Sequence, residues 1–226
     1  MLVIALCKGR FLDPSLELLG RAGICFAEDV ASSRRLIFDS KDGQYRVVLV
    51  KPADVPTYVE YGAADVGIAG RDVIMESRAD LLEPMDLNFG HCRIVVAGKG
   101  GTAGTDSDSG EPVNSRIPGT ASESLPPNLL RIATKYPRIT MDYYTARGIP
   151  VEIIPLSGSI ELAPLIGLAD RIVDVVETGR TLKENGLEVL EVIASCSARL
   201  LINRAGYQTK RDEVLGLIGA LEKAVQ

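Results

Sequence analysis

The side chains best suited to chemistry lie together in residues 171–186. The β-branched run at 171–176 predicts a strand. It carries the carboxylate of Asp174, and Glu177 follows it. A small, hydroxyl-rich turn at 178–181 then leads into a short predicted helix. Backbone N–H groups of such a turn can hold a phosphate, and the neighbouring acids can hold ribose hydroxyls. The segment therefore suits a sugar phosphate, in particular phosphoribosyl pyrophosphate, although an ordinary strand-to-helix turn capped by threonine would look similar.

Cations follow several of the predicted strands. Lys8 and Arg10 come directly after the first one and flank Gly9, which would let a ligand approach the backbone. Lys51 and Lys135 occupy the same place after two other strands. Arginine can clamp a pyrophosphate or triphosphate with two hydrogen bonds. A single such cation could belong to a solvated turn, but chance explains several of them less easily.

Two further segments carry polar groups that could bind a substrate. The pair Arg34-Arg35 precedes a short apolar run and could form a second clamp or a surface ion pair. Ser157 and Gly158 follow a predicted strand and could bind a phosphate or a base. Glu161 falls in the first turn of the next predicted helix. There it could be a surface acid favoured by the helix dipole, or a contact to ribose or Mg²⁺.

Strands and helices alternate along the chain, and most strands are Val/Ile-rich runs without period-2 alternation. Strands are predicted at residues 2–7, 46–51, 65–69, 93–97, 130–134, 151–156, 171–176 and 195–203. Helices are predicted at residues 14–22, 53–62, 72–77, 137–147, 160–168 and 210–225, the last with a capping-box-like start at Thr209. This pattern predicts an α/β fold with mainly parallel sheets.

A short internal echo predicts two similar lobes. Gly62-Ala-Ala-Asp65 and Gly167-Leu-Ala-Asp170 each lie between a predicted helix and a predicted strand. We expect one lobe from residues 1–90 and 180–226, a second from 91–179, and a ligand cleft between them near the C-terminal ends of strands. Residues 99–128 are rich in Gly, Ser, Thr, Pro and Asp and predict a flexible surface loop, since no helix pattern follows their glycine-rich start.

Composition excludes several classes of protein. The net charge of −5 argues against a nucleic-acid surface, and no apolar run approaches the roughly 20 residues of a membrane span. The apolar N-terminus breaks at Lys8 and reads as a buried strand, so we expect a cytoplasmic protein. The four cysteines are widely spaced, which favours reduced, buried thiols over a zinc site or disulfides. His91 is the only histidine, so no mechanism that needs two histidines is available.

Taken together, these segments resemble the ATP phosphoribosyltransferase family. The most specific match is Glu161-x5-Gly167-x-Ala169-x2-Ile172-x-Asp174-Val175-x2-Thr178-Gly179-x-Thr181-Leu182. Supporting matches are Lys8-Gly9-Arg10, residues 54–65, 67–72, 92–93, 133–137 and 156–159. The resemblance implies two lobes like those of type II periplasmic binding proteins. It also implies transfer of the phosphoribosyl group of phosphoribosyl pyrophosphate to N1 of ATP, with Mg²⁺ as cofactor. That reaction is the first step of histidine biosynthesis and releases pyrophosphate.

The resemblance also implies roles for individual residues. The 5-phosphate would be held by Glu177, Thr178, Gly179, Arg180, Thr181 and Leu182. Asp174 and Glu161 would hold ribose hydroxyls. The catalytic groups would be Lys8, Arg10 and Arg34, which engage the pyrophosphate and triphosphate. Lys51, Lys135, Ser157 and Gly158 would complete the ATP or pyrophosphate site, and no metal ligand is assigned.

Three residues depart from the family pattern: Cys7, Phe11, and Lys51 in place of a frequent arginine. Lys51 cannot offer the two-pronged hydrogen bonding of arginine. The length of 226 residues resembles the short form of the family. That form works in a homo- or hetero-oligomer with a regulatory subunit resembling the histidyl-tRNA synthetase catalytic domain. The alternatives are a non-catalytic solute-binding or effector-sensing domain of the same fold, a phosphoribosyltransferase for another base, and a scaffold.

Overall fold

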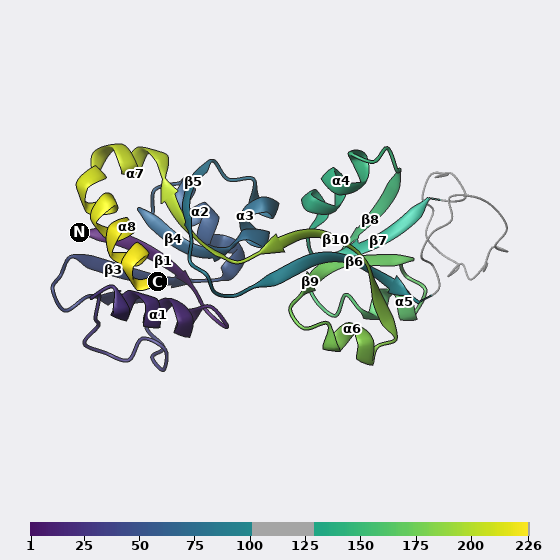
Figure 1. Cartoon of the computed structure of the whole chain (residues 1–226), viewed down its shortest axis with the longest axis horizontal. Helices are drawn as coiled ribbons and strands as arrows, with labels where there is room; N and C mark the ends of the chain where they lie inside the picture. Colours follow the sequence, from purple (N-terminus) through teal and green to yellow (C-terminus); the bar gives the residue numbers. More distant parts are fainter. Residues whose placement is uncertain (101–128, 226) are drawn as a thin grey trace. The chain divides into compact units, whose positions relative to one another are not determined.

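The chain forms two compact units (Figure 1). The computed structural model describes residues 1–100 and 129–225, so residues 101–128 of the loop predicted at 99–128 lie outside the described part. The first unit comprises Met1–His91 and Cys196–Gln226, and the second comprises Cys92–Ser195. The first boundary is one residue from the expected one. The second lies at 195/196 rather than 179/180, because residues 187–196 pair within the sheet of the second unit.

The first unit is a six-stranded sheet with helices, in the strand order β2-β3-β1-β4-β11-β5. Strand β1 is parallel to β3 and β4, whereas the pairs β2–β3, β4–β11 and β11–β5 are antiparallel. The strands are β1 (Leu2–Cys7), β2 (Ile37–Asp39), β3 (Tyr45–Val50), β4 (Val66–Gly70), β5 (Leu81–Asp86) and β11 (Ala198–Asn203). The helices are α1 (Leu12–Arg21), η1 (Pro52–Asp54), α2 (Val55–Glu60), α3 (Arg71–Ser77), α7 (Arg204–Thr209) and α8 (Arg211–Val225).

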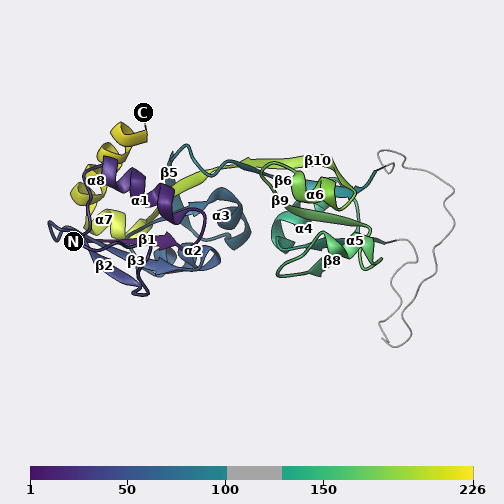
Figure 2. The same ribbon diagram turned by 90° about the horizontal axis from the view of Figure 1, so that it is seen from below.

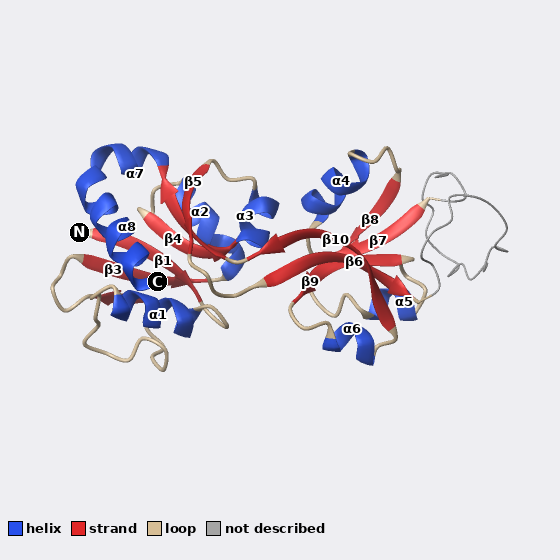
Figure 3. Cartoon of the chain, viewed as in Figure 1, coloured by secondary structure: helices blue, strands red, loops and turns tan. Residues whose placement is uncertain are grey.

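The second unit is a five-stranded sheet in the order β10-β6-β9-β7-β8. Strand β7 is parallel to β8 and β9, and β6 is antiparallel to β9. The strands are β6 (Cys92–Lys99), β7 (Leu130–Thr134), β8 (Val151–Pro155), β9 (Arg171–Val176) and β10 (Leu187–Cys196). The helices are α4 (Pro137–Thr145), α5 (Leu162–Leu165) and α6 (Arg180–Glu184). Figure 3 shows α4 on one side of this sheet and α5 and α6 on the other.

The two units repeat one folding pattern. The run β1-α1-β3-α2-β4-α3 corresponds to β7-α4-β8-α5-β9-α6, and in each the first strand lies between the other two. The sequence echo marks the same corner in both. Asp65 N donates to Val3 O (2.9 Å) and Val3 N donates to the Asp65 carboxylate (2.8 Å). Asp170 and Arg131 make the same two bonds, at 2.9 and 2.8 Å. The predicted α/β architecture with two similar lobes is therefore confirmed, with the parallel pairing confined to three strands of each sheet.

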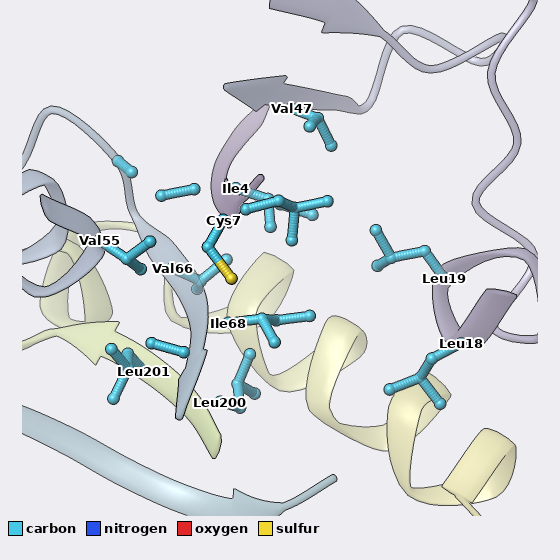
Figure 4. Close-up of a cluster of buried hydrophobic side chains, with 14 of the residues drawn as sticks. Ile4, Cys7, Leu18, Leu19, Val47, Val55, Val66, Ile68, Leu200 and Leu201 are labelled. Carbon is cyan, nitrogen blue, oxygen red and sulfur yellow. The ribbon is translucent and has the colours of Figure 1, made fainter. Parts of the chain in front are cut away.

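Side chains on both faces of the first sheet are buried, which explains its uninterrupted apolar strands. Consecutive residues of a strand point to opposite faces, and Figure 4 shows Leu200 on the side of Leu18 in α1, and Leu201 on the side of Val55 in α2. Helix α1 contacts α8, and Figures 1 and 2 both show them side by side. The apolar stripe of α8 supplies Val214 and Leu221 to this core.

Four local expectations were wrong. The strand expected at 195–203 is two strands in different sheets, since the chain passes between the units at 195/196. The strands β2 and β5, residues 187–194 of β10 and the helix α7 were not anticipated, and the helix expected at 160–168 is only α5. Thr209 does not cap α8, because its hydroxyl donates back to carbonyls of α7. All four cysteines are free thiols, and Cys25 alone among them is exposed.

Within residues 1–100 and 129–225, no helix has the length and apolar character needed to cross a membrane.

Candidate active site

The predicted cations of the first unit meet at one edge of its sheet. Cys7 and Val50 end neighbouring parallel strands in register, and Lys8 N donates to Val50 O (3.0 Å). Lys8 and Lys51 therefore leave the sheet side by side, at the separation of adjacent strands. Both side chains are exposed. Two lysine ammonium groups therefore lie at the carboxyl edge of the parallel strands, where β1 and β3 pass into loops.

The loop after β1 adds an arginine to this edge. Gly9 has φ of 94°, a conformation that disfavours a side chain, so a glycine is needed for the turn. The Arg10 guanidinium lies 4.9 Å from the centroid of the Phe11 ring, which is buried under it. This stacking limits the freedom of Arg10. Phe11, a departure from the family pattern, therefore gives the guanidinium a platform.

Arg34 reaches the same edge from the other side. Strand β2 runs antiparallel to β3, with Ile37 opposite Val48 and Leu49 N donating to Leu36 O (2.8 Å). Residues before β2 therefore lie near the carboxyl end of β3, where Lys51 follows. Arg35 is engaged by Glu28, which leaves Arg34 as the member of the pair suited to a ligand.

Cys7 ends β1 directly before this loop, but it is not a nucleophile. Burial raises the pKa of the Cys7 thiol to about 11, although the Arg10 charge opposes the shift. The thiol is therefore protonated at neutral pH. The chemistry of this edge is that of fixed positive charge.

The second unit brings its predicted residues to the equivalent edge. Thr134 ends β7 opposite Pro155 of β8 and Val173 of β9. Lys135, Leu156 and Asp174 therefore follow three neighbouring strand positions in register, and Ser157 comes directly after Leu156. Lys135, Ser157 and Gly158 are exposed, and Asp174 is half-buried. The structure thus brings together, within this unit, the residues that the sequence placed at strand ends.

The turn between β9 and α6 has the form expected of a phosphate-binding turn. Gly179 adopts φ of 79° as the N-cap of α6. The first hydrogen bond into the helix runs from Lys183 N to Gly179 O (3.1 Å), so the amides of Arg180, Thr181 and Leu182 precede it. Thr178 and Thr181 are exposed beside these amides. Arg180 N donates a long bond to Thr178 Oγ1 (3.4 Å). Hydroxyls and backbone N–H donors therefore lie together at one small turn.

Two members of the predicted turn contribute backbone rather than side chain. The Leu182 side chain is buried, 6% exposed, in the core of the second unit and anchors α6 to the sheet. The Arg180 guanidinium pairs with Glu184 one turn along the helix, at 2.7 Å. The expected phosphate contact of Leu182 can therefore come only from its amide.

The two acids lie on the same face of the second sheet. Asp174 shares its strand face with Ile172 and Val176, which pack in the core beneath α5 and α6. Its Oδ1 atom accepts a bond from Val175 N (2.8 Å). Glu161 is the N-cap residue of α5, on that side, and is half-buried. Both carboxylates can therefore reach one ligand bound above the α5 and α6 face.

Ser159 and Thr134 fall in the segments 156–159 and 133–137 that matched the family pattern, but neither was assigned a role of its own from the sequence. Ser159 has φ of 50°, which is uncommon for a residue with a side chain, and it shapes the turn that carries Ser157 and Gly158. Thr134 is fully buried and hydrogen-bonds to two segments of this edge. A hydroxyl at the last position of the strand, next to Lys135, was the available signal for it.

Two α/β units of this kind, each with a central parallel strand between two others, have the fold of type II periplasmic binding proteins. Two sulfonate-binding proteins are similar to this chain in fold only. SsuA of Xanthomonas axonopodis pv. citri superposes with a TM-score of 0.51 at 14% identity, over 99% of this chain and 72% of the other. SsuA of Escherichia coli superposes with a TM-score of 0.53 at 13% identity, over 99% of this chain and 72% of the other. A family model described as ATP phosphoribosyltransferase matches residues 51–223. The chain belongs to the ATP phosphoribosyltransferase family.

Individual relatives agree with that assignment. The ATP phosphoribosyltransferase of Geobacter metallireducens is 47% identical over 224 residues, covering 99% of this chain and 98% of its own. That of Acidithiobacillus ferrooxidans is 49% identical over 226 residues, covering 99% and 97%. A solved structure, the ATP phosphoribosyl transferase (HisG:HisZ) complex from Thermotoga maritima, superposes with a TM-score of 0.81 at 35% identity, over 100% of this chain and 98% of that chain.

Proposed function

We propose that this chain transfers the phosphoribosyl group of phosphoribosyl pyrophosphate to N1 of ATP, the first step of histidine biosynthesis. The bond from the anomeric carbon to the pyrophosphate oxygen breaks, and a bond to N1 forms. The observation that carries the proposal is the Gly179 turn, which follows Asp174 at the edge that also carries Lys135, in a member of this family. The reaction makes the chain a glycosyltransferase.

The second unit is proposed to bind the ribose 5-phosphate half of the donor. The amides and hydroxyls of residues 178–182 suit a phosphate dianion. Asp174 and Glu161 suit the ribose hydroxyls, since carboxylates on one face of a sheet can accept bonds from a diol. Glu177 follows the strand and borders the turn. Ser157, Gly158 and Lys135 then border the same ligand from the ends of β8 and β7.

We propose that cations of the first unit bind the negatively charged phosphate groups of the substrates. Lys8, Arg10 and Arg34 would engage the pyrophosphate that leaves and the triphosphate of ATP. Charge grows on the leaving pyrophosphate in the transition state, so cations aimed at it accelerate the reaction. Lys51 adds a single ammonium donor at the same edge.

Little acid–base chemistry is needed in this reaction. N1 of ATP is a neutral nucleophile, and departure of pyrophosphate leaves a carbon with oxocarbenium character. Catalysis then depends on holding the reactants in line and on neutralising the leaving group. The single histidine, His91, is exposed, and Cys7 is protonated, which agrees with a reaction that needs no base.

Mg²⁺ is the proposed metal. Residues 1–100 and 129–225 contain no group of three or more His, Cys, Asp or Glu side chains suited to hold a metal ion. Mg²⁺ in nucleotide enzymes is often bound by one or two carboxylates together with substrate phosphates, so Asp174 and Glu161 fit such a shared site. When bound, the ion would neutralise phosphate charge.

We further propose a regulatory partner and a cytoplasmic location. The similar Thermotoga maritima structure is a HisG:HisZ complex, and the curated relatives match this chain over nearly their whole length. By that likeness the chain is the short-form catalytic subunit, in a hetero-oligomer with a subunit resembling the histidyl-tRNA synthetase catalytic domain. Feedback by histidine would then act through the partner.

The test is formation of phosphoribosyl-ATP from ATP, phosphoribosyl pyrophosphate and Mg²⁺, followed by ultraviolet absorbance with and without the partner subunit and histidine. Product that histidine inhibits only in the complex supports both the activity and the partner. If neither the chain nor the complex forms product while phosphoribosyl pyrophosphate still binds, another base is the substrate. If phosphoribosyl pyrophosphate does not bind at all, a solute-binding domain of the same fold replaces the proposal.

A further inference from the structure

One buried residue bonds to three segments that lead to proposed substrate ligands of the second unit. The Thr134 hydroxyl donates to Val173 O of β9 (2.7 Å) and accepts from Tyr136 N (2.8 Å). The Thr134 carbonyl accepts from Leu156 N (2.9 Å). Val173 immediately precedes Asp174 within β9, the strand that leads to the phosphate turn; Tyr136 follows Lys135, and Leu156 precedes Ser157. Thr134 therefore joins the Lys135 turn to β9 and to the end of β8.

The Thr134 hydroxyl has no second proton to donate. A threonine hydroxyl has a single proton to donate, and that of Thr134 goes to Val173 O. The Thr140 hydroxyl donates its own proton to Tyr136 O (2.7 Å). The 3.3 Å contact between the two threonine oxygens consequently has no proton of its own. The Thr134 hydroxyl therefore provides a side-chain link from the Lys135 turn to β9.

Comparison with the first unit shows which of these hydrogen bonds both units share and which one belongs to the second unit. There Ser15 donates to Phe11 O (2.6 Å), four residues back, as Thr140 does to Tyr136. The residue that ends the first strand is Cys7 instead of a threonine. The helix bond is thus common to both units, whereas the strand-end hydroxyl is a feature of the unit with the phosphate turn.

We propose that Thr134 is a positioning residue for phosphoribosyl pyrophosphate. Its hydroxyl fixes the Lys135 turn against β9, so that Lys135, Asp174 and the Gly179 turn keep the spacing that the substrate requires. The inference rests on the proposed function, because it assigns the Lys135 turn, the Ser157 turn and the end of β9 to one substrate. The residue itself is fully buried and touches no ligand.

The test compares Thr134→Val with Thr134→Ser and Thr140→Val in the complex of catalytic and regulatory subunits. Valine keeps the shape of threonine and removes the hydroxyl. We expect Thr134→Val to raise KM for phosphoribosyl pyrophosphate about tenfold or more, the scale at which small misplacements act. Thr134→Ser should restore it. Thr140→Val is the matched control, since Thr140 is equally buried and its proton goes to the N-cap carbonyl of α4, Tyr136 O, and not to β9; the KM of this variant should be unchanged.

A second substitution covers the case in which Thr134→Val does not fold. Thr134→Cys copies the residue that ends β1 in the first unit, and a thiol is a weak hydrogen-bonding group. It should fold and raise the same KM. Equal KM changes in Thr134→Val and Thr140→Val, or unchanged kinetics in folded Thr134→Val and Thr134→Cys, would overturn the inference. Inactive wild-type complex would instead contradict the proposed function, so the two failures are distinct.

Discussion

Replacing Gly179 by alanine tests whether the turn after β9 holds the sugar phosphate. Gly179 has φ of 79°, and a Cβ there would meet no heavy atom closer than Val176 Cγ1 at 3.7 Å. The substitution therefore adds conformational strain without a clash, about 1–2 kcal/mol for a left-handed residue with a side chain. If the turn relaxes, the binding-competent fraction falls, and KM for phosphoribosyl pyrophosphate rises by up to about 5- to 30-fold.

Gly186 provides a matched control at the other end of the same helix. It has φ of 68°, and a Cβ there would meet nothing within 4 Å. Gly186→Ala should therefore cost about the same 1–2 kcal/mol of strain. It lies beyond α6, away from the Thr178–Thr181 amides, so KM should stay unchanged. Urea unfolding followed by circular dichroism would compare the stability of the two variants.

The assay is the initial rate of phosphoribosyl-ATP formation at saturating ATP over a range of phosphoribosyl pyrophosphate concentrations. Gly179→Asn serves as a rescue, because asparagine tolerates the left-handed conformation better than alanine. A Gly179→Ala enzyme with normal KM would refute the assignment of this turn. So would an equal rise of KM in Gly186→Ala, since strain alone would then explain both.

Three further predictions address Arg10 in the first unit, the aspartates of the internal echo and the pH dependence of stability. Arg10→Ala should lower kcat by an amount equal to about 2–4 kcal/mol with little change in the KM for phosphoribosyl pyrophosphate, measured by steady-state kinetics; a normal kcat would contradict its proposed role. Asp65→Ala should lower the free energy of unfolding by about 2 kcal/mol and Asp170→Ala by less, because the Asp65 side chain is 12% exposed and that of Asp170 43%; equal losses in urea titrations would contradict this. Burial and the hydrogen bond to Glu191 raise the pKa of Tyr143 to about 12. The stability that Tyr143 contributes is therefore complete below its ordinary pKa near 10 and is lost between pH 10 and 12; Tyr143→Phe should flatten that fall in urea titrations, and an unchanged pH profile would contradict it.

Strong local signals in the sequence predicted much of the fold. Strands β1, β7 and β9 begin and end at the predicted residues, because each is a mainly apolar or β-branched run that charged or small residues follow. The echo of Gly62–Asp65 in Gly167–Asp170 correctly indicated two related units. Its aspartates make the same paired bonds in both, a constraint that a short sequence pattern can carry.

Other elements depend on partners that are distant in sequence. Strand β5 pairs with β11 across more than a hundred residues, and neither its length nor its composition marks it as a strand. The run at 195–203 reads as one strand because its residues are uniformly suited to β structure. It divides at Ser197, whose hydroxyl donates to Asp86 Oδ2 (2.8 Å) on β5. Only the pairing of the two sheets decides where such a run divides.

By itself, the sequence determined the family, the two-unit α/β plan and the residues at strand ends, because these depend on local composition, spacing and chemistry. The tertiary structure decided which of these residues share an edge. The register of parallel strands places Lys8 beside Lys51, and Lys135 beside Asp174 and Leu156, the residue before Ser157. The structure also separated side chains at the sheet edge from those that serve the core, such as Leu182, and revealed Thr134 as the residue that joins the Lys135 turn to β9 and to the end of β8. Pairing and burial are non-local properties, since each depends on what the rest of the chain brings alongside.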